Sequence, residues 1–162
     1  NNMSENYLRG ASKALRQMMT AASQTINNSP TAPSDKDVHL RNQLITEEVL
    51  EFLTATLGNT PEAQGTLEKM GQVLSELKLM SANNVKVVDI DMLEVVDALV
   101  DIEVINIGTS LTYGINIDAG FNIVHQSNMA KVNPQTGCMD KNEFGKIIKP
   151  AGWVAPDLSG LI

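Results

Sequence analysis

The chain contains a single cysteine, Cys138, so the sequence offers no disulfide framework and no cysteine-rich metal site. Aromatic residues make up only 4% of the 162 residues, so aliphatic side chains must fill the core, which favours helix packing over a β-sandwich. Basic residues are also few, 12 Lys and Arg against 19 Asp and Glu, and the net charge of −7 disfavours nucleic acids and anionic membranes as partners. No apolar run is long enough to span a membrane and no signal peptide precedes the first predicted helix. We therefore expect a single cytoplasmic domain over residues 1–162.

Hydrophobic periodicity predicts an all-α fold, a bundle of four to five helices. We expect Ser34 or Asp35 to cap the second helix, Gly114 to end the fourth and Asp118 to cap the fifth. The predicted helices cover approximately residues 4–23, 36–57, 60–80, 86–113 and 118–130.

The last thirty residues, 133–162, are rich in Gly, Pro, Asn and Asp and cannot hold a long helix. We expect an irregular tail that forms a short hairpin and then an extended segment. The extended segment should pack Trp153 against the body of the protein or against a partner subunit.

Three acids, Glu47, Glu48 and Glu51, lie on one side of the second predicted helix. At about 100° per residue they fall within roughly a quarter turn, and apolar residues cover the other faces. A helix that is apolar nearly all round is usually buried, and buried carboxylates must be neutralised. Hard oxygen ligands suit Mg²⁺ or Mn²⁺, so divalent cations are the leading candidates.

A second acidic stripe, Glu94, Asp97 and Asp101, follows the fourth predicted helix within an arc of roughly 60°. No basic residue stands four positions after an acid in either stripe to form an ion pair within its helix. The simpler interpretation is that both stripes are solvated surfaces of amphipathic helices. The alternative is a carboxylate-lined metal site inside a four-helix arrangement.

These residues resemble the all-α nucleoside triphosphate pyrophosphohydrolases, a group that includes the MazG-like enzymes, the dimeric dUTPases and phosphoribosyl-ATP pyrophosphohydrolase. The group's motif is EExxE followed downstream by ExxD, and Glu47-Glu48-Val-Leu-Glu51 matches its first half. The later segments HQSNMAK (125–131) and GKIIKPAGWVAPDL (145–158) look like the tail of the phosphoribosyl-ATP pyrophosphohydrolase-like branch, often found in phage and bacteria.

The second half of the motif departs from the group's pattern. If Asp101 takes the place of the final Asp, Ala98 stands where the Glu is expected. Either Asp97 takes over that role, or Glu94-Val-Val-Asp97 is itself an ExxD one turn earlier.

The resemblance implies hydrolysis of a nucleoside or deoxynucleoside triphosphate to a monophosphate and pyrophosphate, with Mg²⁺ or Mn²⁺ as cofactor. The implied metal ligands are the acids of both stripes, and Glu48 would orient or deprotonate the attacking water. The resemblance also implies a homodimer or homotetramer, and a host-cytoplasm location if a phage encodes the protein.

An acidic protein also needs local cations and polar groups against the phosphates of its substrate. The candidates are Lys131 and Asn128, with Lys146 and Lys149 in the tail behind them. A basic line in the first predicted helix, which includes Lys13 and Arg16, is either a solvated face or a surface that approaches an anionic ligand.

Overall fold

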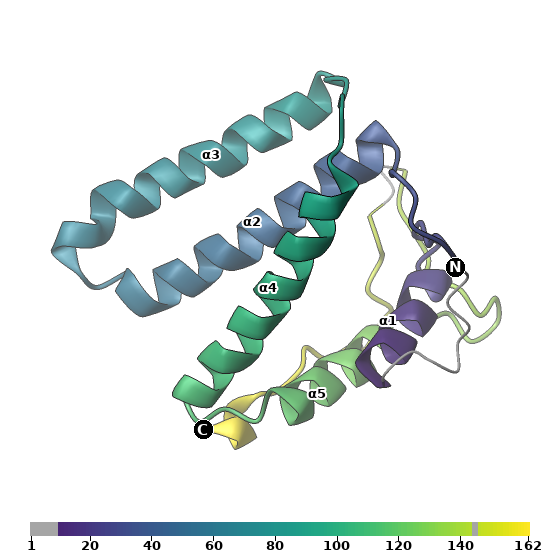
Figure 1. Ribbon diagram of the computed structural model, residues 1–162. Helices are drawn as coiled ribbons and strands as arrows, with labels where there is room; N and C mark the ends of the chain where they lie inside the picture. Colours follow the sequence, from purple (N-terminus) through teal and green to yellow (C-terminus); the bar gives the residue numbers. More distant parts are fainter. Residues whose placement is uncertain (1–9, 144–145) are drawn as a thin grey trace. The chain divides into compact units, whose positions relative to one another are not determined.

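The computed structural model describes residues 10–143 and 146–162, so residues 4–9 of the first predicted helix lie outside the described part. The described residues form five α-helices and no β-sheet, which confirms the all-α prediction (Figure 1). They divide into two compact units, residues 32–92 and residues 1–31 with 93–162, and each unit is considered by itself. The α-helices are α1 (Gly10–Ala21), α2 (Asp35–Leu57), α3 (Gln64–Ala82), α4 (Met92–Thr112) and α5 (Ile117–Met129).

The unit of residues 32–92 is an antiparallel pair of helices, α2 and α3, that pack along their lengths (Figure 1). Ser34 caps α2, because its hydroxyl accepts a hydrogen bond from the backbone N–H of Asp37 at 3.2 Å. A short 3₁₀ helix, η2 (Pro61–Ala63), precedes α3, where the sequence predicted one continuous helix from residue 60. Leu74 of α3 and His39 of α2 are the buried side chains of this pair.

The segment between α3 and α4 is extended, so the prediction that a helix starts near residue 86 was wrong by about one and a half turns. Two features oppose a helix here. Val85, Val87 and Val88 are β-branched, and Asp89 takes a left-handed conformation with φ of 53°.

The second unit contains α1, α4, α5 and the tail. Helix α1 packs against α5. The core of this unit is small, because the buried apolar side chains that cluster together are Ala21, Ala22 and Met139. The backbone N–H of Met139 donates to the Ala21 carbonyl at 2.8 Å, which joins the tail to the end of α1.

A tight turn joins α4 to α5. Gly114 takes φ of +70°, a left-handed conformation that favours glycine, and it ends α4 as predicted. Asn116 caps α5, since its side-chain oxygen accepts a hydrogen bond from the N–H of Ala119 at 3.0 Å. The prediction of Asp118 as the cap was wrong, because that residue already lies inside the first turn of α5.

Helix α4 exposes its large side chains. Leu93, Val104 and Leu111 are 77%, 60% and 73% exposed, and Ser110 is the buried residue of the helix. A helix that is apolar nearly all round is usually buried, so in the single chain the apolar faces of α4 are available to other surfaces. None of the helices in the described part of the chain is long and apolar enough to cross a membrane.

The tail is irregular, as predicted. Two isolated antiparallel bridges, between Val132 and Met139 and between Lys141 and Ile147, give it a hairpin-like start. Further on, the indole N–H of Trp153 donates to the Ser127 carbonyl at 2.8 Å. Trp153 therefore packs on α5, one of the two locations that the sequence left open.

Candidate active site

The first acidic stripe lies on α2, the helix that α3 covers on one side. Glu47 is half-buried, whereas Glu48 and Glu51 are exposed. Because the acids remain hydrated in the single chain, the burial cost expected from the sequence does not arise there.

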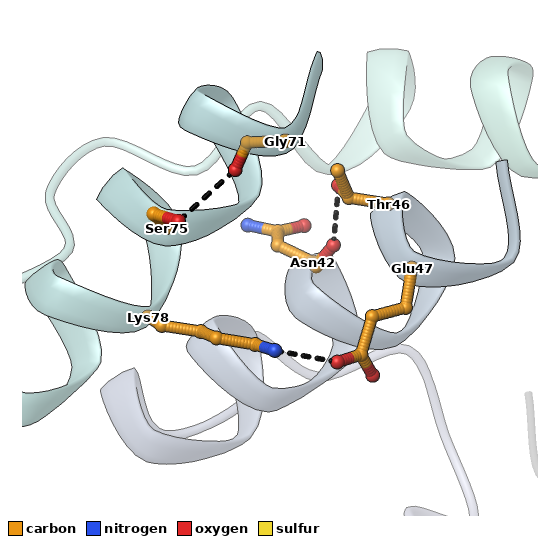
Figure 2. A network of polar contacts seen from close by, with 6 residues as sticks. All are labelled: Asn42, Thr46, Glu47, Gly71, Ser75 and Lys78. Atoms are coloured by element: carbon orange, nitrogen blue, oxygen red, sulfur yellow. Dashed lines mark hydrogen bonds and ion pairs between the residues drawn. The ribbon is translucent and has the colours of Figure 1, made fainter. Parts of the chain in front are cut away.

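Glu47 has an ion-pair partner from the neighbouring helix. The ammonium of Lys78 on α3 lies 2.7 Å from Glu47 Oε1, and Figure 2 shows the two side chains meeting between the helices. The Lys78 and Glu47 side chains are 51% and 38% exposed, so this is a partly solvated pair. Helical spacing indicates only pairs within one helix, and it gives no sign of this pair because the two residues are 31 positions apart.

His39 fixes the start of α2 against the segment that follows α3. Its side chain is 7% exposed, and its Nε2 lies 2.7 Å from the Val85 carbonyl oxygen. This contact holds the beginning of α2 near the end of α3, and it sets the position of the helix that carries the first acidic stripe.

The second acidic stripe lies on α4. Glu94, Asp97 and Asp101 are all exposed and occupy the first three turns of the helix. They belong to the unit of residues 1–31 and 93–162, whereas the α2 acids belong to the other unit. Convergence of the two stripes therefore stays a prediction, as does the choice between Asp97 and Glu94 for the role left open by Ala98.

The donor chemistry of both stripes fits a hard divalent cation. Each stripe offers several exposed carboxylates whose oxygens are the ligands that Mg²⁺ and Mn²⁺ prefer. Among the described residues, no group of three or more His, Cys, Asp or Glu side chains is arranged to hold a metal ion. A metal site at these acids therefore stays a prediction.

The predicted phosphate-binding residues lie at the end of α5 and in the tail. Lys131 donates to Asn128 Oδ1 at 2.9 Å, and its ammonium lies 5.0 Å from the centroid of the Trp153 ring. The ammonium of Lys149 lies 4.6 Å from the same centroid. Burial, and secondarily the charge of Lys149, lower the pKa of Lys131 below the ordinary lysine value. The structure thus brings together three residues, Lys131, Asn128 and Lys149, that the sequence only proposed separately.

Lys146, the fourth candidate, is exposed and lies in the hairpin. Its backbone N–H donates to Asn142 Oδ1 at 2.9 Å, and its carbonyl accepts from the Asn142 N–H at 2.9 Å. Both hydrogen bonds are made by its backbone within the hairpin, and the role of its side chain at the phosphates stays a prediction.

The basic side chains of α1 border a cavity. Lys13 and Arg16 line a space of about 610 Å³ together with Thr20, Met129 and Val132. Among the described residues that line this cavity, none is acidic. Of the two interpretations of the basic line, this placement favours a surface that an anionic ligand can approach.

Comparison with known proteins places the chain among the pyrophosphohydrolases. A family model described as phosphoribosyl-ATP pyrophosphohydrolase matches residues 15–128. A crystal structure from Exiguobacterium sp. 255-15, provisionally described as an NTP pyrophosphohydrolase, is similar with a TM-score of 0.69 and 26% sequence identity. The similarity covers 91% of this chain and 89% of that one. The search of curated proteins finds no match.

Proposed function

The chain belongs to the phosphoribosyl-ATP pyrophosphohydrolase family, and from that premise we propose that it hydrolyses a nucleoside or deoxynucleoside triphosphate to a monophosphate and pyrophosphate. The observation that carries the proposal is the extent of the family match. Residues 15–128 include α2 and α4, and with them both acidic stripes. The similar crystal structure, whose description names NTP as the substrate class, supports a nucleoside triphosphate without the phosphoribosyl group over phosphoribosyl-ATP.

Mg²⁺ or Mn²⁺ would neutralise and position the triphosphate, the chemistry that such ions supply in phosphoryl transfer. The proposed ligands are Glu47, Glu48, Glu51, Asp97 and Asp101, with Glu94 as the alternative on α4. Their carboxylate oxygens suit these ions.

Glu48 is the proposed residue that orients or deprotonates the attacking water. It is exposed on the same side of α2 as Glu47 and Glu51. An exposed carboxylate keeps an oxygen that a water molecule can reach, which a general base requires.

The phosphates also need positive charge from the protein, because the chain carries a net charge of −7. Lys131, held by Asn128, and Lys149 are the proposed contacts, with Lys146 as a further candidate from the hairpin. Ammonium groups bind phosphate oxygens through charge-assisted hydrogen bonds.

The chain is further proposed to act as a homodimer or homotetramer. Val100, Val104 and Leu111 are 57%, 60% and 73% exposed, and they lie within an arc of roughly 40° on α4. Full burial of one such side chain contributes about 1.5–3 kcal/mol. A continuous exposed apolar surface of this kind is typical of an interface between protein chains.

An alternative function is a non-catalytic regulator that keeps the fold and binds nucleotide or metal. The specific observation in its favour is Ala98, which stands where the ExxD motif has its Glu if Asp101 is the final Asp of the motif.

A panel of nucleoside and deoxynucleoside triphosphates, incubated with the protein and Mg²⁺, separates the two functions through pyrophosphate release. We expect turnover of at least one nucleotide, and a loss of about 10²-fold or more in Glu48→Gln. Glu68→Gln, which neutralises an exposed acid on α3, is the matched control and should retain activity. Tight nucleotide binding without turnover on the whole panel would select the regulator.

A further inference from the structure

Trp153 is held firmly on α5 by hydrogen bonds on two sides. Its indole N–H donates to the Ser127 carbonyl at 2.8 Å, and the Ser127 hydroxyl donates to the carbonyl of the next tail residue, Val154, at 3.3 Å. These bonds fix the plane of the half-buried ring and the path of the tail beside it.

Two ammonium groups lie over this one ring. The distances from Nζ to the ring centroid, 5.0 Å for Lys131 and 4.6 Å for Lys149, are both within the range of cation–π attraction. The lysines come from different segments, the end of α5 and the tail, so the indole is the feature that gathers them. Asn128 Oδ1 accepts a hydrogen bond from Lys131 and fixes one of the two ammonium groups further.

The two positive charges lack a compensating acid within the described part of the chain. No carboxylate there lies within the 4.0 Å of either ammonium that defines an ion pair. Like charges held at one ring repel each other, and this repulsion adds to burial, the larger cause, in lowering the pKa of Lys131. An anion placed against both would relieve the repulsion and gain two charge-assisted hydrogen bonds.

We propose that Lys131 and Lys149, held over Trp153, form an oxyanion site that takes a pyrophosphoryl group without the help of a metal ion. The inference rests on the proposed function, because that reaction supplies the group twice, as the terminal phosphates of the substrate and as the pyrophosphate released. A pyrophosphoryl group carries several oxygens and more than one negative charge, so it can contact both ammonium groups at once. Trp153 is a positioning residue in this site, since it acts through the lysines.

Trp153 is the only tryptophan in the chain, so its fluorescence reports directly on the site. Inorganic pyrophosphate is titrated into the full chain with EDTA present, which excludes divalent cations. We expect a saturable change in emission, and at least tenfold weaker binding in Lys131→Gln and in Lys149→Gln. Lys141→Gln removes an exposed charge from the same tail and should bind within twofold of the unaltered protein. No saturable change, or an equal loss in the control, would overturn the inference.

The role of the indole is tested by calorimetry, which does not need its fluorescence. Trp153→Phe keeps an aromatic face for the two ammonium groups, so its pyrophosphate affinity should stay within about threefold of that of the unaltered protein. Trp153→Ala removes that face, and its pyrophosphate affinity should fall at least tenfold. Equal affinities in the two variants would show that the ring does not organise the lysines. Inorganic phosphate should bind at least tenfold more weakly than pyrophosphate, and equal binding would overturn the assignment of a pyrophosphoryl group.

A non-hydrolysable triphosphate with an α,β-imido link identifies the source of the group. Competition with pyrophosphate assigns the site to the terminal phosphates of the substrate, and lack of competition assigns it to the released product. Failure of the inference differs from failure of the proposed function. Metal-free pyrophosphate binding without any hydrolysis would overturn the function alone, and hydrolysis without metal-free binding would overturn the inference alone.

Discussion

Removal of the Lys78 ammonium should strengthen metal binding, because the lysine occupies the proposed metal ligand Glu47. The ammonium lies 2.7 Å from the carboxylate, and a cation that binds Glu47 must displace it or share the oxygen. The Lys78 and Glu47 side chains are 51% and 38% exposed. Exposed pairs of this kind contribute about 0.2–1 kcal/mol, and that free energy is what the metal must overcome.

At 1.4 kcal/mol per factor of ten, this range corresponds to a gain in Mn²⁺ affinity of at most about fivefold in Lys78→Gln. The gain should shrink as ionic strength rises, since salt screens exposed charges. Loss of the pair should lower the free energy of unfolding by no more than about 1 kcal/mol, so the variant stays folded.

Isothermal titration with Mn²⁺ measures the effect. The control is Lys69→Gln, which removes the same charge from an exposed position on the same helix. Equal affinities in the two variants would refute the reasoning, because they would show that Lys78 does not compete with metal at Glu47.

The remaining predictions concern stability and assembly. Met139→Ala should lower the free energy of unfolding by about 2–4 kcal/mol in urea denaturation, because it removes the largest buried side chain of the cluster at the end of α1. Gly114→Ala should cost about 1 kcal/mol by thermal denaturation, since φ of +70° disfavours a Cβ, and a neutral effect would contradict that conformation. Because the pKa of Lys131 is lowered in the folded chain, the folded chain binds fewer protons than the unfolded chain between that pKa and about 10.4. The free energy of unfolding should therefore rise with pH across this window, and Lys131→Gln should abolish the rise. Val104→Lys should shift the protein to smaller assemblies in light scattering, whereas Asn106→Lys, with the same added charge on α4, should not.

The sequence predicted the helices well where local signals decide them. Ser34 and Gly114 mark helix ends through their own side-chain and backbone chemistry, and both assignments are confirmed. The cap of α5 was misplaced because Asn116 and Asp118 are both good capping residues two positions apart. The start of α4 was misplaced because the apolar residues before it, including Val87 and Val88, fit an extended segment as well as a helix.

The site was less predictable because its contacts join residues far apart in the chain. Periodicity placed Glu47 on the correct side of α2 but could not show that Lys78 pairs with it from α3. Lys131 and Lys149 were proposed from their segments alone, and no local pattern indicated that Trp153 would bring them to one ring. The packing of α3 on α2 determines the first arrangement, and the packing of the tail on α5 determines the second. The spacing of residues that are neighbours in the sequence indicates neither packing.

We propose that acids from α2 and α4 bind the same divalent ions during pyrophosphate release. A double-mutant cycle on Mn²⁺ affinity, with Glu51→Gln and Asp101→Asn, tests it most directly. We predict that each single substitution weakens Mn²⁺ binding at least tenfold. The fold-loss of Mn²⁺ affinity in the double variant should be clearly smaller than the product of the two single fold-losses, because both residues serve one site. Unchanged affinity in both single variants, or fully independent losses in the double variant, would contradict the account.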